Sequence, residues 1–312
     1  MILSVSRRTD IPAFYSNWFF EQLKQGFVLV PNPINPNKIA RIKLEPLKVK
    51  NIETNFFGEN KVEMEGNVEG IVFWTKNPKP MLSQLDKLKD YRYYFLYTLN
   101  AYPEVIEANL PSIADRINSF KELSKHCPVI WRYDPILLTK DINVAWHIEN
   151  FANLCKELDG YTKHCKISFV IQSYKGCSNE VFAPNEQQKN ELLSKFSQIA
   201  KIHKIQIEAC AESGNWSKYE IVPSKCIDGE IFEDLLTERF NEDNIKVKRK
   251  NNKIDGQRKY CNCMPAIDIG RYDTCKHGCN YCYARKGTPK SMLDNLSGEI
   301  YDRKTELEFE YN

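Results

Sequence analysis

Short apolar segments alternate with amphipathic segments along the first two-thirds of the chain, and this alternation most constrains the fold. The apolar segments are rich in β-branched and aromatic residues, as strands buried on both faces are. We predict strands at 2–6, 27–30, 70–75, 93–99, 129–133, 166–171 and 205–210. We predict helices at 18–25, 111–124, 144–158 and 185–203. Such alternation pairs strands in parallel through right-handed crossovers, so we predict an α/β fold with a (β/α) barrel or partial barrel.

Charged side chains gather where the predicted strands end, which is where a (β/α) barrel carries its active site. The predicted site residues are Arg7, Arg8, Asp10, Lys76, Arg132, Asp134, Glu208 and Glu212. Arginine binds carboxylates and phosphates through two parallel hydrogen bonds, so this mouth suits a cofactor carboxylate or an anionic substrate. The alternative is that these charges pair with one another and fix loops.

Three cysteines near the C-terminus, Cys275, Cys279 and Cys282, have the spacing C-x3-C-x2-C. Thiolates at this spacing can bind three irons of one cubane iron–sulfur cluster from a single tight loop, and Gly278 permits the sharp turn. Because structural clusters usually have four thiolates, three indicate chemistry at the open iron. The alternative is a zinc knuckle completed by His277 or a remote cysteine, although zinc sites usually combine two C-x2-C pairs.

A second set of cysteines has the ligand number of a closed metal site. It comprises Cys210, Cys226, Cys261 and Cys263, the last two forming a C-x-C pair. Four thiolates suit zinc or an iron–sulfur cluster. The alternative is that Cys210 and Cys226 are buried apolar residues, as free cysteines often are. We expect Cys127, Cys155, Cys165 and Cys177 to be structural.

Cysteine usage also indicates the compartment. Eleven cysteines, several in C-x-C and C-x3-C-x2-C patterns, are atypical of a secreted disulfide scaffold, so we expect reduced thiols in the cytoplasm. No basic region precedes the short apolar N-terminal stretch, and no window approaches about 18 uninterrupted apolar residues. We therefore expect neither a signal peptide nor a membrane helix.

Composition suggests two parts of the chain. Residues 1–240 would form the barrel-like domain, with a polar excursion at 48–66 that we interpret as a surface hairpin. Residues 241–312 would form a cysteine-rich segment that carries the C-x3-C-x2-C loop and packs on the barrel. A basic run at 246–250 lies near the start of this segment and is interpreted as a solvated loop or a phosphate contact.

The C-x3-C-x2-C loop, with Tyr281 and Tyr283 flanking its last cysteine, resembles the cluster loop of the radical S-adenosylmethionine (SAM) enzymes. In that superfamily three cysteines hold a 4Fe–4S cluster on a (β/α)6 partial barrel, and SAM binds the fourth iron. Their loop follows the first strand, whereas this one closes the chain. A strand at 266–270 would return it to the mouth, as in a permuted barrel. No Gly-Gly-Glu string follows the loop, so backbone carbonyls or Glu208 and Glu212 would bind the SAM amino group.

Longer strings at 4–15, 73–78, 131–135 and 268–284 resemble a bacterial and archaeal family known only as a domain of unknown function. The resemblance spans nearly the whole chain, and that family's C-terminal cysteines are similar to the radical-SAM loop. It implies Cys275, Cys279 and Cys282 as cluster ligands, and the second cysteine set also falls on the family's cysteine-bearing strings. Residues 48–66 look like an insertion relative to the family pattern.

These resemblances imply a radical-SAM-type enzyme acting on an unknown substrate. A low-potential donor of the flavodoxin or ferredoxin type would supply an electron, and SAM would be cleaved to methionine and a 5′-deoxyadenosyl radical. The arginines at the mouth and the basic run suggest a nucleotide or nucleic acid as substrate. One alternative is a barrel stapled by zinc or a closed cluster, acting as a hydrolase, lyase or binding module. Another is an electron-transfer protein.

Overall fold

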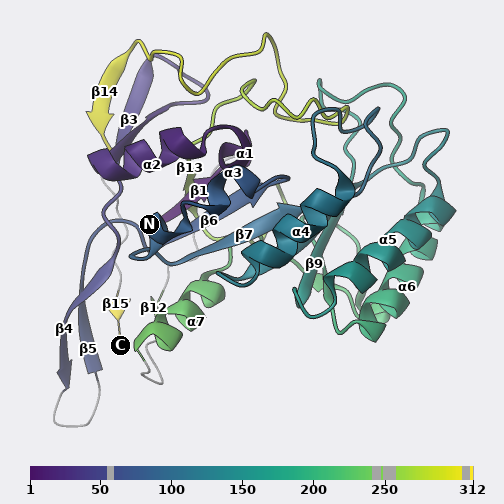
Figure 1. Ribbon diagram of the computed structural model, residues 1–312, viewed down its shortest axis with the longest axis horizontal. Coiled ribbons are helices and arrows are strands. Elements are labelled where there is room, and N and C mark those ends of the chain that lie inside the picture. The colour runs from purple at the N-terminus through teal and green to yellow at the C-terminus, as the bar shows by residue number, and fades with distance from the viewer. Residues whose placement is uncertain (55–59, 241–246, 249–257, 304–309, 312) are drawn as a thin grey trace.

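The centre of the molecule is one sheet of eight parallel strands (Figure 1). The computed structural model describes residues 1–54, 60–240, 247–248, 258–303 and 310–311. The strands are β1 (Ile2–Val5), β6 (Gly70–Thr75), β7 (Tyr93–Thr98), β8 (Val129–Ile136), β9 (His164–Phe169), β10 (Gln206–Ala209), β11 (Val222–Pro223) and β13 (Ala266–Asp268). All their pairings are parallel. The predicted α/β class with a large parallel sheet is therefore confirmed.

The strand order places the C-terminal segment beside the N-terminal strand. The order across the sheet is β11-β10-β9-β8-β7-β6-β1-β13, so from β6 to β11 successive strands are neighbours. The last strand, β13, pairs with β1, with Ile2 opposite Ala266 and Ser4 opposite Asp268. The strand predicted at 266–270 is thus present. It delivers the residues that follow it to the carboxyl end of β1.

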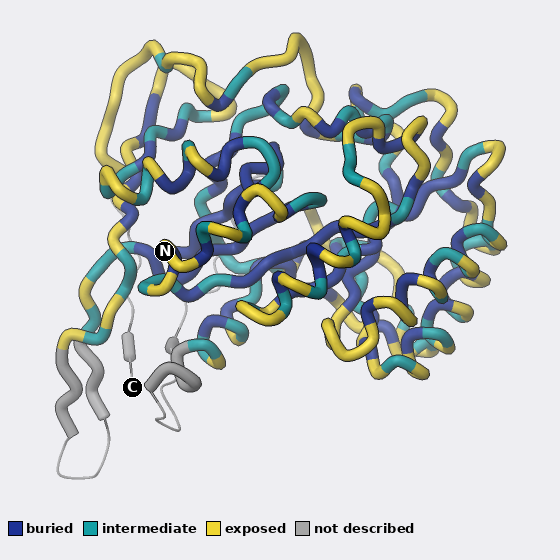
Figure 2. The backbone as a smooth tube through the Cα atoms, in the orientation of Figure 1, coloured by how far each residue is buried: buried dark blue, intermediate teal, exposed yellow. Residues whose placement is uncertain are grey.

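Helices from the first two-thirds of the chain pack on one face of this sheet. They are α1 (Ile11–Phe14), α2 (Ser16–Gln25), α3 (Lys79–Leu82), α4 (Ile113–Leu123), α5 (Val144–Leu158) and α6 (Glu186–Ile202), with the 3-10 turns η1 (Leu85–Leu88) and η2 (Ser217–Tyr219). As predicted, α2 ends at Gly26, whose left-handed φ of 82° suits glycine. A capping box at Asn185 and Gln188 begins α6. Alternate strand residues, among them Phe73 and Trp131, fill this core, and Figure 2 shows the strands as buried.

The other face of the sheet is covered by α7 (Gly229–Phe240), which was not predicted. Phe232 of α7 packs so closely on Gly70 that a Cβ there would lie 2.2 Å from its ring. Val72, Tyr94 and Ile130 complete this second core. Because glycine leaves room for the aromatic ring, α7 can pack directly against this face of the sheet.

The segment predicted as a strand at 27–30 lies outside the main sheet, which corrects the prediction. It is β2 (Phe27–Pro31), which pairs antiparallel with β3 (Lys38–Lys43), and β14 (Glu299–Asp302) completes this sheet. Only alternate residues of β2 are buried, the pattern of a sheet with one solvated face. The uninterrupted apolar run concealed this one-sided burial.

The excursion at 48–66 forms an antiparallel hairpin, as predicted, from β4 (Lys48–Thr54) and β5 (Asn60–Glu65). A further pair is β12 (Val247–Lys248) with β15 (Glu310–Tyr311). The rest of the basic run at 246–250 lies outside the described residues. Within the described ranges, no helix combines the length and apolar character needed to cross a membrane.

His147 of α5 should give the protein a pronounced acid sensitivity. Its Nδ1 lies 2.7 Å from the Tyr133 hydroxyl and its Nε2 lies 2.6 Å from the Leu137 carbonyl oxygen, which satisfies the neutral ring. Burial lowers its pKa to about 4. The unfolded chain therefore takes up this proton first, so stability falls as the pH drops from about 6.5 to 4, by about 3 kcal/mol.

Urea unfolding at pH 7 and pH 4.5 measures this effect. The difference in unfolding free energy between the two pH values should shrink in His147→Gln. The exposed His126 supplies the control, and His126→Gln should keep the wild-type difference. An unchanged pH dependence in His147→Gln would contradict the assignment.

Candidate functional site: the cysteine loop at the end of the sheet

The segment 274–284, here called the cysteine loop, is fastened to loops that follow the parallel strands. The Asn109 amide donates to the His277 carbonyl oxygen at 3.0 Å, and the Asn280 amide donates to that of Ile106 at 3.0 Å. The Ser178 amide donates to the Asn280 carbonyl oxygen at 2.6 Å. Main-chain hydrogen bonds to the segments after β7 and β9 therefore position the loop.

The three thiols of the loop lie together. Cys279 is buried, Cys275 and Cys282 are half-buried, and each thiol interacts electrostatically with the others. Burial raises the pKa of Cys275 to about 12 and raises that of Cys279 well above the usual range. Gly278 adopts a left-handed φ of 70°, which glycine allows at little cost. Thiols in this setting need a bound cation to stay ionised.

His277 does not serve as a free fourth donor in the loop. Its side chain is buried, with Nε2 2.7 Å from Asp10 Oδ2 and Nδ1 3.2 Å from the Asn109 carbonyl oxygen. Because both ring nitrogens already have partners, this arrangement disfavours the zinc knuckle completed by His277. The imidazole instead ties the cysteine loop to the end of β1.

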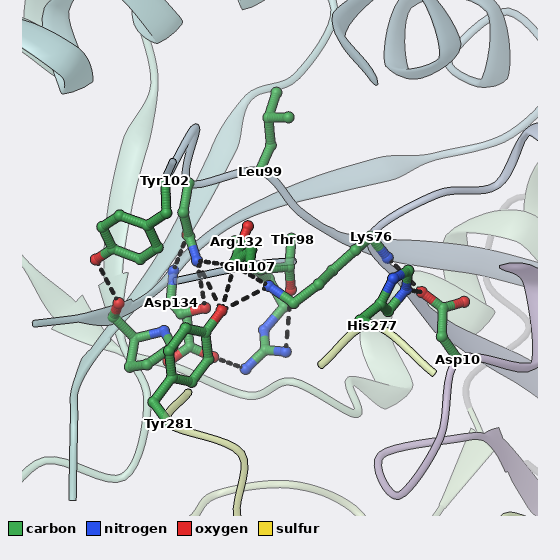
Figure 3. A network of polar contacts seen from close by, with 12 residues as sticks. Asp10, Lys76, Thr98, Leu99, Tyr102, Glu107, Arg132, Asp134, His277 and Tyr281 are labelled. Atoms are coloured by element: carbon green, nitrogen blue, oxygen red, sulfur yellow. Dashed lines mark hydrogen bonds and ion pairs between the residues drawn. The ribbon is translucent and has the colours of Figure 1, made fainter. Parts of the chain in front are cut away.

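Asp10, predicted as a catalytic residue, joins three parts of the site (Figure 3). Its Oδ1 accepts hydrogen bonds from the Ala13 amide at 2.9 Å and from the Thr75 hydroxyl at 2.8 Å. Its Oδ2 accepts from the Lys76 amide at 2.7 Å and contacts His277. With both oxygens occupied, Asp10 caps α1 and positions the ends of β1, β6 and the cysteine loop.

Lys76 belongs to a buried network with Glu107 and Tyr281 (Figure 3). Its Nζ lies 2.6 Å from Glu107 Oε1 and 2.9 Å from the Tyr281 hydroxyl, which itself donates to Glu107. Arg116 Nη1 lies 3.5 Å from the other Glu107 oxygen. Burial favours a raised pKa for Glu107, but Lys76 and Arg116 outweigh it and lower the pKa to about 2. An ionised carboxylate missed by the sequence analysis thus holds the cysteine loop.

Arg132 and Arg7 both contact the ring of Trp74. The Arg132 guanidinium lies 4.8 Å from the Trp74 ring and binds the Asp134 carboxylate. The Arg7 guanidinium lies 5.9 Å from the same ring, and its Nε is 3.6 Å from Asp268. Both arginines interact electrostatically with Tyr283. These charges are paired with acids, as the alternative predicted, yet they also face the cysteine loop.

The other two carboxylates of the predicted set, and Arg8, make separate contacts. Glu208 lies within β10 and pairs with Lys166 at 2.5 Å, and the prediction that it lines the mouth is therefore corrected. Glu212 accepts a hydrogen bond from the Phe169 amide at 3.0 Å, and burial raises its pKa. Arg8 stacks on Tyr272 at 5.2 Å, beside the segment that leads into the loop.

The second cysteine set is also brought together by the fold. Cys210 Sγ lies 3.3 Å from Cys226 Sγ, Cys226 is hydrogen-bonded to Cys263, and Cys263 to Cys261. The bonds from Cys210 and Cys263 lower the pKa of Cys226 well below that of an ordinary thiol. The thiols contact one another in series. Among the described residues, no three Cys, His, Asp or Glu side chains surround a common point suited to a metal ion as they stand.

Gly176 provides a direct test of how the cysteine loop is seated. A Cβ at this position would lie 2.0 Å from the Cys282 carbonyl oxygen, so Gly176→Ala must displace one of the two segments. We expect a loss of roughly 1–3 kcal/mol of stability and faster labelling of Cys282 by a thiol reagent. Gly287→Ala is the matched control, because its Cβ would meet only Asp273 Oδ2 at 3.8 Å. Equal labelling rates in the two variants would show that the loop is seated differently.

A family model described as "Domain of unknown function (DUF1848)" matches residues 2–284. The chain belongs to this family. The DUF1848 match includes both cysteine sets and confirms the resemblance drawn from the sequence strings. No curated protein matches the chain.

Among solved structures, one similar chain is a "putative alpha-L-fucosidase" from Bacteroides thetaiotaomicron VPI-5482. The two chains share 13% sequence identity, and the match has a TM-score of 0.29. It covers 53% of our chain and 52% of the fucosidase chain. Our chain thus spans about half of that protein, and a likeness this low carries no argument about activity.

Proposed function

We propose that the cysteine loop binds a 4Fe–4S cluster through Cys275, Cys279 and Cys282, and that the protein is a SAM-dependent enzyme. The observation that carries this proposal is the placement of three thiols at the carboxyl ends of parallel strands, with the loop's histidine already engaged. This donor set fits a cluster with one open iron better than a closed four-ligand site.

The strand arrangement supports a permuted partial barrel for this chemistry. Successive strands are neighbours from β6 to β11, and β13 joins the sheet beside β1. The cysteine loop follows β13, whereas the enzymes that it resembles carry the loop after the first strand. A strand added at the β1 edge would bring a C-terminal loop to the end of the sheet where those enzymes carry their loop.

When bound, the cluster and SAM supply one-electron reductive cleavage of the sulfonium, giving methionine and a 5′-deoxyadenosyl radical that takes hydrogen from the substrate. We assign the protein side chains to binding and shielding. Arg7 and Arg132, beside Tyr283, would bind an anionic group such as the SAM carboxylate. Tyr281 is buried and would exclude water from the loop while Lys76 and Glu107 hold its hydroxyl.

The SAM amino group would need an acceptor. Glu208 is engaged by Lys166, so Glu212 or backbone carbonyls of the strand ends are the proposed acceptors. We propose a cytoplasmic enzyme that receives electrons from a flavodoxin- or ferredoxin-type donor. A nucleotide or nucleic acid is proposed as substrate on the basis of the arginines beside the loop.

Product analysis of anaerobically reconstituted protein tests the function. In the presence of dithionite and SAM, wild-type protein should form 5′-deoxyadenosine and methionine in equal amounts, and Cys275→Ala should form neither. Arg132→Lys keeps the charge but loses the planar fork, so we expect weaker SAM binding with the cluster intact. An iron-loaded wild type that neither binds nor cleaves SAM would favour an electron-transfer protein. Zinc in the loop would favour the stapled barrel.

A further inference from the structure

The segments next to the two edge strands of the main sheet carry the second cysteine set. Cys210 directly follows β10, and Cys226 lies between β11 and α7. Cys261 and Cys263 lie in the segment that leads into β13. Since β11 and β13 are the two edges of the sheet, these four thiols come from both sides of its opening.

The two sides are in direct contact at this place. Cys210 Sγ lies 3.3 Å from Cys226 Sγ, and the Ile227 amide donates to Cys263 Sγ at 3.5 Å. The Met264 amide donates to the Ile227 carbonyl oxygen at 2.9 Å, which continues the contact through the main chain. Cys226 and Cys261 also interact with Cys263, so one connected group contains all four thiols.

The surroundings of these sulfurs combine apolar side chains with guanidinium groups. Cys210 and Cys226 are buried in the same cluster as Trp74, and three arginines also interact with the thiols. Arg258 Nη2 lies 3.4 Å from Cys210 Sγ and 3.3 Å from the Cys210 carbonyl oxygen. Arg132 interacts electrostatically with Cys226 and Cys210, and Arg7 with Cys263 and Cys226. Neutral buried thiols do not require three guanidinium groups nearby, whereas thiolates bound to a divalent ion leave a net negative charge for them to balance.

We propose that Cys210, Cys226, Cys261 and Cys263 bind a single zinc ion that closes the sheet between β11 and β13. Zinc holds thiolates at about 2.3 Å in a tetrahedron, which separates the sulfurs by roughly 3.8 Å. The 3.3 Å between Cys210 and Cys226 is close to this separation. A cubane cluster would hold its sulfurs much farther apart, because each one binds a different iron. Side-chain rotations would bring the four thiols from contact in series to contact with one ion.

This site is separate from the cysteine loop and does not rest on the SAM chemistry proposed for it. Its role would be structural, because four thiolates fill the coordination of zinc and leave no open position. Arg7 and Arg132 interact electrostatically with thiols of this site and also with Tyr283 of the cysteine loop. The zinc would therefore fix the two arginines that the proposed function assigns to an anion.

Metal analysis of the full chain, purified under reducing conditions, tests the proposal. We expect about one zinc per chain, with an X-ray absorption spectrum showing only sulfur neighbours at about 2.3 Å. Cys226→Ser should reduce zinc to background. Cys155→Ser, which alters a buried cysteine of α5, should keep it. The combined Cys275→Ala, Cys279→Ala and Cys282→Ala variant should also keep the zinc, even though it loses iron.

The spectrum of the wild-type protein keeps the test decisive if Cys226→Ser fails to fold. Zinc with nitrogen or oxygen neighbours, or zinc that disappears in the cysteine-loop variant, would overturn the proposal. Iron and sulfide on these four cysteines would overturn it in favour of a second cluster. A wild-type protein without zinc but with a Cys210–Cys226 disulfide would show that the set is a redox pair.

Discussion

Replacing Cys279 with alanine should abolish iron binding at the cysteine loop. Cys279 is the buried middle thiol of the loop, and it interacts with both other thiols, so two cysteines alone would remain to hold a cluster. After anaerobic reconstitution, iron and sulfide should fall from about four of each per chain to background, with loss of the brown cluster absorbance.

Cys127→Ala is the matched control for this variant. Cys127 follows α4 and packs against the helix-covered core, away from the thiols of the loop. It should load iron like the wild type. Full iron loading of Cys279→Ala would show that other cysteines hold the cluster.

Glu107→Gln should have the largest effect on stability. The carboxylate is fully buried between Lys76 and Arg116, so a neutral amide would leave both cations without their counter-charge. Breaking a buried ion pair of this kind costs roughly 3–5 kcal/mol. Because Tyr281 and Lys76 meet at this carboxylate, the cysteine loop should also become more accessible to thiol reagents.

The exposed Glu104 provides the control, and Glu104→Gln should change the unfolding free energy by less than about 0.5 kcal/mol. The pH dependence supplies a second readout. Since the folded pKa of Glu107 is about 2, its contribution is present above its ordinary pKa and is lost as the pH falls toward 2. Unfolding measured between pH 5 and pH 3 should therefore depend less on pH in Glu107→Gln than in wild type. Equal stabilities of Glu107→Gln and Glu104→Gln would contradict the network.

Much of the sheet could be predicted from the sequence because its strands and helices have distinct periods. Strands such as 70–75 are apolar on both faces, and helices such as 144–158 show one apolar face, so local patterns report burial directly. β2 was misassigned because four consecutive apolar residues hide its one-sided burial. β11 was missed because two residues, both exposed, carry no pattern.

The site was predictable where a reactive or charged residue has a telling position in the sequence, such as a ligand spacing or the end of a strand. The thiols of the cysteine loop are brought together by their spacing, and Asp10 and Lys76 directly follow strands. Glu107 was missed because it lies well beyond the end of β7, and we looked for site residues only at the ends of strands. Its role depends on Arg116 from α4 and Tyr281 from the cysteine loop, contacts that only the tertiary structure supplies.

Electron paramagnetic resonance of anaerobically reconstituted, dithionite-reduced protein, recorded with and without SAM, tests the central proposal most directly. We predict a reduced-cluster signal that shifts when SAM is added and that is absent in Cys279→Ala. A signal that is the same with and without SAM would contradict SAM binding at the open iron. The absence of an iron-dependent signal, with zinc bound by the cysteine loop instead, would contradict the iron–sulfur assignment itself.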